Sequence, residues 1–254
     1  MAFVNLKFFS ETLDRNVDIN AIVPQRSAGG DIGISNRGSQ EKYKTLLLLH
    51  GLSDDNTIWC RRTSIERYAV EHGIAVVMPS ADRSFYTDMK HGDKFFTFIS
   101  QEVLRVAREF LPLSDKREDT FVAGNSMGGY GAFKAALKNP DIFSAAIGLS
   151  SVADVDKFMK ERSPHLMDNV FGESVPDSER LFFLFEQIKN QTLKPRIYSC
   201  VGKDDFMYED NVKLSKIIEK SGCDYTYVEA DGAHNWEFWD KHIQNALKWL
   251  FNKE

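Results

Sequence analysis

Gly124-Asn125-Ser126-Met127-Gly128-Gly129 is the segment from which the architecture of this 254-residue chain follows most directly. It comes immediately after the apolar run Thr120–Ala123, which is typical of a buried strand, and immediately before a helix-like segment at Tyr130–Lys138. A serine between glycines at a strand-to-helix turn is the pattern of a nucleophile elbow, because small neighbours let the backbone turn sharply. The start of a helix also favours negative charge that develops beside the serine. The pattern therefore favours Ser126 as a nucleophile over a simple glycine-rich turn.

Strands are predicted on both sides of this elbow. Five further apolar runs have the length of buried strands: Thr45–Leu49, Ile74–Met78, Phe143–Leu149, Arg196–Val201 and Tyr225–Glu229. Near the start of the chain, Val4–Phe9 and Val17–Val23 are joined by the turn-like Leu13–Asn16, which predicts an antiparallel hairpin at the sheet edge.

Helices are predicted between the strands. Three sets of residues recur at helical spacing: Phe95, Ile99, Val103, Val106 and Phe110; Tyr208, Val212, Ser215 and Ile218; and Trp239, Ile243, Ala246 and Leu250. The alternation predicts an α/β-hydrolase fold, with a mostly parallel sheet covered by helices on both faces, as one domain over residues 1–254. Residues 151–194 interrupt the rhythm and predict a small, partly helical cap, whereas residues 24–42 are rich in polar residues and glycine and predict a loop.

Composition excludes several classes of partner. The chain has 32 Lys and Arg against 37 Asp and Glu, a net charge of -5, and no basic run longer than two residues, so nucleic acid is not an expected partner. It also lacks a signal-peptide pattern at its start and any apolar run of membrane-spanning length, which predicts a cytoplasmic protein without membrane contact.

The three cysteines, Cys60, Cys200 and Cys223, form no CxxC pair and are expected to be reduced thiols. No metal or organic cofactor is expected.

A serine nucleophile needs a base, and α/β-hydrolases supply their partners in the order Ser, Asp or Glu, His. Three histidines follow Ser126: His165, His234 and His242. Only His234 falls in a loop between a predicted strand and the last helix, where an imidazole could reach the serine. His165, in the cap, and His242, inside the last helix, are expected to be structural or surface residues.

The acid is expected in the loop after Arg196–Val201, which contains Asp204 and Asp205. An acid at this position would hold the imidazole in the useful tautomer and stabilise the imidazolium. Either aspartate fits, and either could instead cap the helix that follows. The residues by themselves leave this choice open.

The oxyanion of an acyl-transfer intermediate needs two donors. The backbone N–H of Met127 is one, and that of Leu52 is the expected second, in the loop His50-Gly51-Leu52-Ser53 after the Thr45–Leu49 strand. His50 is expected to support this loop by hydrogen bonding rather than to take part in chemistry. Four aromatic residues near the predicted loops could line an apolar pocket or equally pack in the core: Trp59, Tyr86, Phe206 and Trp236.

Taken together, these segments resemble the esterase D family, and within it the bacterial tributyrin esterase and acetyl esterase branch. The matching motifs are His50–Ser53 with Trp59 and Arg62-Thr63, Met78-Pro79, Tyr86–Asp88, Lys116–Glu118, Ala123–Gly131, Gly202–Glu209 and Gly232–Trp236. The resemblance spans the first strand to the last helix. It implies hydrolysis of short-chain acyl esters by a triad of Ser126, Asp205 and His234, and it selects Asp205 over Asp204. The chain departs from the family in 27–38 and in the cap, which leaves the natural substrate open.

The predicted reaction is that of a serine carboxylesterase with an acyl-enzyme intermediate. A thioesterase similar to S-formylglutathione hydrolase would use the same residues, as would an acyltransferase that passes the acyl group to a sugar. A non-enzymatic binding protein would require a missing triad member, and all three candidates are present. Because this branch of the family often forms oligomers, a homo-oligomer is also an expectation.

Overall fold

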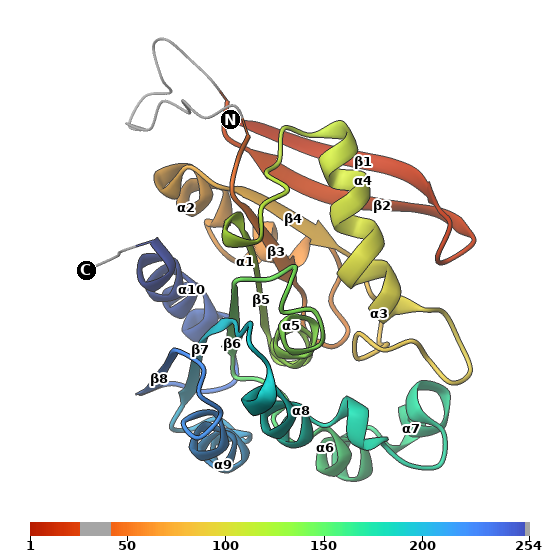
Figure 1. Ribbon diagram of the computed structural model, residues 1–254, viewed down its shortest axis with the longest axis vertical. Coiled ribbons are helices and arrows are strands. Elements are labelled where there is room, and N and C mark those ends of the chain that lie inside the picture. Colours follow the sequence, from red (N-terminus) through yellow and green to blue (C-terminus); the bar gives the residue numbers. More distant parts are fainter. Residues whose placement is uncertain (26–41, 252–254) are drawn as a thin grey trace.

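Eight strands form one sheet in this computed structural model, which describes residues 1–25 and 42–251 (Figure 1). Their order across the sheet is β1-β2-β4-β3-β5-β6-β7-β8. The strands are β1 Ala2–Ser10, β2 Arg15–Val23, β3 Thr45–Leu49, β4 Ala75–Pro79, β5 Thr120–Asn125, β6 Ala145–Leu149, β7 Arg196–Gly202 and β8 Tyr225–Ala230.

Only β2 runs opposite to the other strands of the sheet. β1 pairs antiparallel with β2, and β2 pairs antiparallel with β4, whereas all pairings from β4 to β8 are parallel. The predicted hairpin therefore lies at the edge of a mostly parallel sheet. The carboxyl ends of the parallel strands meet at one edge, where α/β proteins place their ligand sites.

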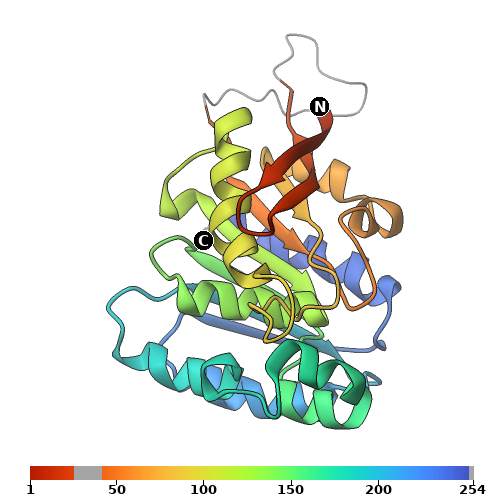
Figure 2. The same ribbon diagram turned by 90° about the vertical axis from the view of Figure 1, so that its right-hand side faces the viewer.

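Helices cover both faces of the sheet (Figures 1 and 2). One face carries α1 Ile58–Arg62, α2 Ile65–His72 and α10 Trp236–Phe251. The other carries α3 Phe95–Thr97, the π-helical turn η1 Phe98–Glu102, α4 Val103–Phe110, α5 Met127–Lys138 and α9 Tyr208–Ile218. The short helices α1 and α2 were not predicted from the sequence.

Alternation along each strand explains why the predicted strands read as continuous apolar runs. On β3, Leu47 and Leu49 belong to the core on the α5 face, while Leu46 and Leu48 belong to the core on the α10 face. Successive side chains of a strand point to opposite faces, so a sheet covered on both faces needs apolar residues at every position. The whole of β3 is buried accordingly.

The predicted helix around residues 95–110 is present but contains an irregular turn. Phe95, Ile99, Val103 and Val106 are buried as expected, whereas Phe110 is 60% exposed, so this last position of the predicted apolar face is wrong. The π-helical turn ends at Glu102, whose carboxylate accepts hydrogen bonds from the Ser10 hydroxyl and from the N–H groups of Glu11 and Thr12. The turn thereby ties the helix to the β1–β2 hairpin.

The segment predicted as a cap lies between β6 and β7 and is largely helical (Figure 2). Its elements are α6 Val155–Arg162, α7 Pro164–Phe171, η3 Asp177–Glu179, α8 Leu181–Gln187 and η4 Ile188–Asn190. Asp154 caps α6 by accepting the N–H of Lys157 at 3.0 Å, and Pro164 opens α7 at a position that suits proline. The predicted loop at 24–42 lies outside the described residues except for its ends.

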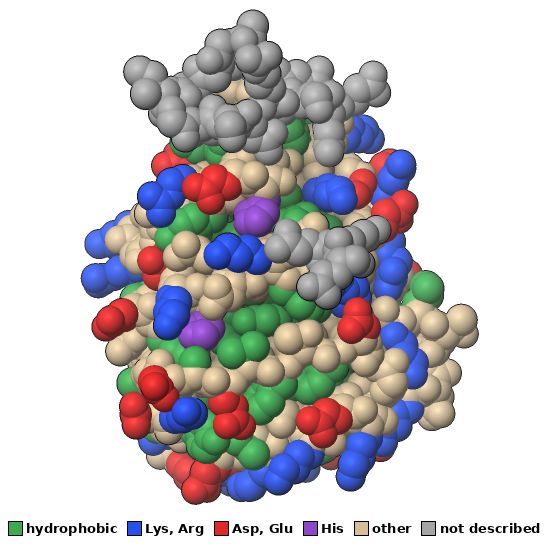
Figure 3. Space-filling model, turned by 90° about the vertical axis from the view of Figure 1, so that its left-hand side faces the viewer, with side chains coloured by type: hydrophobic (Ala, Val, Ile, Leu, Met, Phe, Trp, Pro, Cys, Tyr) green, Lys and Arg blue, Asp and Glu red, His purple; other side chains and the backbone are tan. Residues whose placement is uncertain are grey.

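The side of the molecule that lies on the left in Figure 1 carries both apolar and charged side chains. Figure 3 shows hydrophobic side chains interspersed with acidic and basic ones on this face. In the described part of the chain, no helix combines the length and the apolar character that crossing a bilayer would require.

Candidate active site

Ser126 occupies a strained turn between β5 and α5. Its φ of 54° and ψ of -117° place it in a region that residues with a side chain rarely adopt. The flanking glycines make this turn feasible: a Cβ on Gly124 would lie 2.4 Å from the Gly128 backbone, and one on Gly128 would lie 2.5 Å from the Leu49 oxygen. The sequence GNSMG therefore folds into the predicted elbow.

Three side chains from different loops meet at this elbow. Nε2 of His234 lies 3.0 Å from Oγ of Ser126, and Nδ1 of the same ring lies 2.9 Å from Oδ2 of Asp205. Because a carboxylate can only accept, Nδ1 carries the hydrogen of the pair and Nε2 is left to accept the hydrogen of the serine hydroxyl. Ser126 and Asp205 are 7% and 4% exposed, so these hydrogen bonds are shielded from bulk water.

The structure distinguishes the two neighbouring aspartates. Asp205 is buried, and its second carboxylate oxygen accepts the N–H of Met207 at 2.8 Å, which fixes the orientation of the side chain. Asp204 is exposed, and its backbone N–H donates to the oxygen of Gly232. Of these two aspartates, only Asp205 forms a hydrogen bond with His234.

Aromatic rings hold His234 in place. The Phe206 ring lies over it, with ring centroids 4.6 Å apart, and Trp239 meets it edge-on at 4.8 Å. The other two candidate histidines lie elsewhere: His165 is exposed, and His242 is buried inside α10. Neither is in contact with Ser126.

Two backbone N–H groups, those of Met127 and Leu52, were predicted from the sequence to hold an oxyanion. Met127 is the first residue of α5, so no carbonyl one helical turn earlier accepts its N–H. Leu52 follows β3 in a tight turn in which Ser53 has a φ of 70° and the N–H of Asp54 donates to the oxygen of Gly51. Both predicted oxyanion donors therefore come from turns at the carboxyl edge of the sheet.

His50 supports the Leu52 turn, as predicted. Its Nε2 accepts the N–H of Ala81 at 2.9 Å, so Nδ1 carries the hydrogen that is donated to the oxygen of Gly51 at 2.7 Å. Burial lowers the pKa of His50 and keeps the ring neutral, as this pair of hydrogen bonds requires. Both ring nitrogens are thus engaged with backbone.

A cavity of about 450 Å³ opens over Ser126 and His234. Among the four aromatic residues considered from the sequence, Phe206 and Trp236 line it together with Phe158 of α6. Trp59 and Tyr86 are instead buried and donate hydrogen bonds to the oxygens of Leu49 and His50. The cavity is thus mainly apolar, and Asp54, Asn125 and Asn235 add polar groups to its wall. Within 1–25 and 42–251, no group of three or more His, Cys, Asp or Glu side chains is placed to hold a metal ion.

Comparisons with known proteins agree with this geometry. The family model described as "Putative esterase" matches residues 10–250. An acetyl esterase of Caldicellulosiruptor saccharolyticus is 33% identical over 98% of both chains.

Two solved structures from Staphylococcus aureus are also 33% identical, and each comparison covers 99% of both chains. One is a fluorophosphonate-binding serine hydrolase with bound substrate, at a TM-score of 0.89, and the other is an S-formylglutathione hydrolase, at a TM-score of 0.85. Their overall similarity to this chain confirms the α/β-hydrolase fold predicted from the sequence.

Proposed function

Because this chain belongs to the esterase family and is a serine hydrolase of carboxylic esters, we propose that Ser126 attacks short-chain acyl esters, with His234 as the base and Asp205 as the acid that orients it. The observation that carries the proposal is the chain of two hydrogen bonds, of 2.9 and 3.0 Å, from Asp205 through His234 to Ser126. A serine hydroxyl is a weak nucleophile until such a base removes its proton.

The proposed reaction assigns roles to His234, Ser126 and the two backbone donors. Nε2 of His234 takes the proton of Ser126 as Oγ attacks the ester carbon, and the N–H groups of Leu52 and Met127 hold the oxyanion. His234 then protonates the leaving alkoxide, and a water molecule releases the acid from the acyl-enzyme by the same steps. Each oxyanion donor contributes roughly 3 kcal/mol in related chemistry, which is about two orders of magnitude in rate, so the placement of Leu52 also matters for turnover.

The size and lining of the cavity favour a substrate with a small acyl or alcohol group. Its volume of about 450 Å³ is in the lower part of the range for small-molecule pockets, and its aromatic wall suits an apolar group next to the reacting carbonyl. The similar acetyl esterase supports the same size class.

A panel of p-nitrophenyl esters from acetate to octanoate tests the proposal, with wild type and Ser126→Ala measured side by side. We expect turnover to be highest for the shortest chains and to fall to the background rate in Ser126→Ala. Equal turnover by the two proteins would remove Ser126 from the mechanism.

A thioester is the second candidate substrate. The structural similarity to an S-formylglutathione hydrolase, at 33% identity, favours its inclusion, and the same three side chains would attack a thioester carbon. Adding S-formylglutathione to the panel decides between the two: a kcat/KM far above that of every oxygen ester would make the thioester the preferred class.

A further inference from the structure

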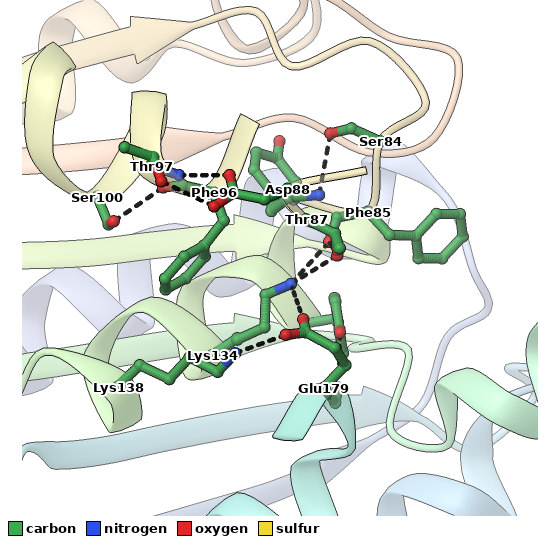
Figure 4. A network of polar contacts seen from close by, with 12 residues as sticks. Ser84, Phe85, Thr87, Asp88, Phe96, Thr97, Ser100, Lys134, Lys138 and Glu179 are labelled. Carbon is green, nitrogen blue, oxygen red and sulfur yellow. Dashed lines mark hydrogen bonds and ion pairs between the residues drawn. The ribbon is translucent and has the colours of Figure 1, made fainter. Parts of the chain in front are cut away.

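A buried ammonium group lies on the helix that follows the elbow. Lys134 of α5 is 0% exposed, and its Nζ donates to three oxygens: Oγ1 of Thr87 at 2.7 Å, Oε2 of Glu179 at 2.7 Å and the backbone oxygen of Phe85 at 3.3 Å (Figure 4). Lysine is almost never fully buried without partners, because desolvating its charge is costly. The proposed hydrolysis uses none of these groups directly.

Glu179 compensates the charge of this lysine. Its two carboxylate oxygens bind Lys134 and Lys138, one helical turn apart on α5, at 2.7 and 2.6 Å. Burial lowers the pKa of Lys134 to about 8, with Glu179 opposing the shift, so the lysine is mainly charged at neutral pH. Lys138, in contrast, has no contact with Thr87 or Phe85 in the described parts of the chain.

The oxygens on the other side of Lys134 belong to a strained turn. Phe85 and Tyr86 have φ values of 50° and 49°, and two successive left-handed residues with aromatic side chains are unfavourable by about 1–2 kcal/mol each. Such backbone persists only where its surroundings fix it. Here Lys134 binds Phe85 and Thr87, while the Tyr86 N–H donates to Oγ of Ser84 at 3.1 Å.

This turn places the Tyr86 hydroxyl against the loop His50–Ser53, which contains Leu52. The hydroxyl donates to the backbone oxygen of His50 at 2.8 Å, and Tyr86 is 1% exposed. His50 in turn binds Gly51 through its ring, directly before Leu52. An unbroken series of contacts therefore runs from Lys134 through Tyr86 and His50 to the residue that supplies an oxyanion donor.

We propose that Lys134 is a positioning residue for the oxyanion hole: its ammonium holds the strained turn 84–87, which holds Tyr86 against His50 and thereby fixes the N–H of Leu52. The inference rests on the proposed function, in which the Leu52 amide binds the oxyanion. The same ammonium binds Glu179 of η3, so Lys134 joins the segment 151–194 to the turn 84–87.

Three variants test the proposal. Tyr86→Phe removes only the hydroxyl that binds His50, Lys134→Met removes the ammonium, and Lys138→Met is the matched control that removes the other lysine bound to Glu179. For each, kcat and KM are measured with p-nitrophenyl butyrate, together with the affinity for an alkyl trifluoromethyl ketone. Oγ of Ser126 adds to this ketone, the proton passes to His234, and the resulting oxyanion occupies the hole.

We expect kcat to fall at least tenfold in Tyr86→Phe and Lys134→Met, with KM changed less than threefold, and the ketone to bind at least tenfold more weakly. Lys138→Met should stay within twofold of wild type on all three measures. An oxyanion-hole donor acts mainly on the transition state, so a purely structural role would not link kcat to ketone affinity in this way. If Lys134→Met does not fold, Tyr86→Phe decides alone.

Wild-type kcat and ketone affinity in Tyr86→Phe would overturn the inference while leaving the proposed function intact. A loss in Lys138→Met as large as that in Lys134→Met would also overturn it, because the effect would then come from Glu179 and not from the turn. The proposed function fails separately, when wild type shows no turnover that depends on Ser126.

Discussion

Oδ2 of Asp205 lies 2.9 Å from Nδ1 of His234, and among the described residues the carboxylate has no other histidine as a partner. The contact fixes which ring nitrogen faces Ser126. The neighbouring Asp204, one residue earlier in the same loop, makes no such contact, so the two aspartates form a natural pair of test and control.

Asp205→Asn should lower kcat by on the order of 10³- to 10⁴-fold, because an amide at this position can donate to Nδ1 and favours the wrong tautomer of the ring. Asp204→Asn should remain within twofold of wild type. Both values come from steady-state kinetics with p-nitrophenyl butyrate. A larger loss in the Asp204 variant would reassign the acid.

Gly128→Ala should disrupt the elbow. The new Cβ would lie 2.5 Å from the oxygen of Leu49 and 2.7 Å from that of His50, and neither backbone atom can move without displacing β3. We expect the free energy of unfolding to fall by about 2 kcal/mol or more, with kcat lowered at least a hundredfold. Gly92→Ala is the control, since the atoms nearest to its Cβ, at 2.9–3.2 Å, belong to the side chain of Met89, whose end can move aside, and not to backbone. Equal stability and activity of the two variants would contradict the steric account.

Phe206→Ala should affect binding more than chemistry. This ring covers His234 and is 49% exposed at the cavity, so it offers apolar surface to a substrate without being part of the core. We expect KM for aryl esters to rise roughly three- to tenfold, with kcat changed less than threefold. Phe183→Ala, at 39% exposure and not in the cavity wall, should leave KM unchanged. A large drop in kcat alone would indicate that Phe206 acts by orienting His234.

His242→Phe should stabilise the protein. Within residues 1–25 and 42–251, both ring nitrogens of His242 are buried without a hydrogen-bond partner, and the ring stacks on Phe238 with centroids 4.1 Å apart, an arrangement that a phenyl ring can keep. Removing two unpaired polar atoms should raise the free energy of unfolding by about 1 kcal/mol at pH 7.5.

The same variant should be less sensitive to acid. Burial lowers the pKa of His242 and of His50 below the ordinary 6.5, so the unfolded chain binds more protons, and stability falls as the pH drops through 6.5 toward the folded-state values. Urea unfolding at pH 7.5 and 5.5 should show a smaller loss in His242→Phe than in wild type. An equal loss would mean that His242 does not contribute to the acid sensitivity.

The strands were predictable because burial on both faces leaves a continuous apolar run, as in β3 and β4. The helices α1 and α2 were not predictable, since α1 has five residues and α2 has eight, which gives too few turns for a periodic pattern. The exposed Phe110 shows the converse error. A residue at the correct helical spacing can still lie beyond the edge of the core.

Some residues of the candidate site could be predicted from the sequence alone, and others could not. Chain order and loop position single out His234, because only that histidine follows a strand and precedes the last helix. Asp204 and Asp205 could not be separated by residue chemistry, since adjacent loop residues point in directions that only the folded backbone defines. The contact of Asp205 with His234 agrees with the choice that the family resemblance implied.

The buried Lys134 gave no sequence signal. A lysine on a helix is usually solvated, and its partners Thr87 and Glu179 lie 47 and 45 residues away along the chain. No local pattern encodes a pairing over such separations. Only the folded structure brings the helix, the strained turn and the segment around η3 together.

Covalent labelling tests the central claim, that His234 activates Ser126 as the nucleophile, most directly. Wild type and His234→Ala are treated with an alkyl fluorophosphonate, and the modified peptide is identified by mass spectrometry. We predict one adduct per chain, on Ser126, formed at least a hundredfold more slowly in His234→Ala. An adduct on another residue, or equal labelling rates in the two proteins, would contradict the claim.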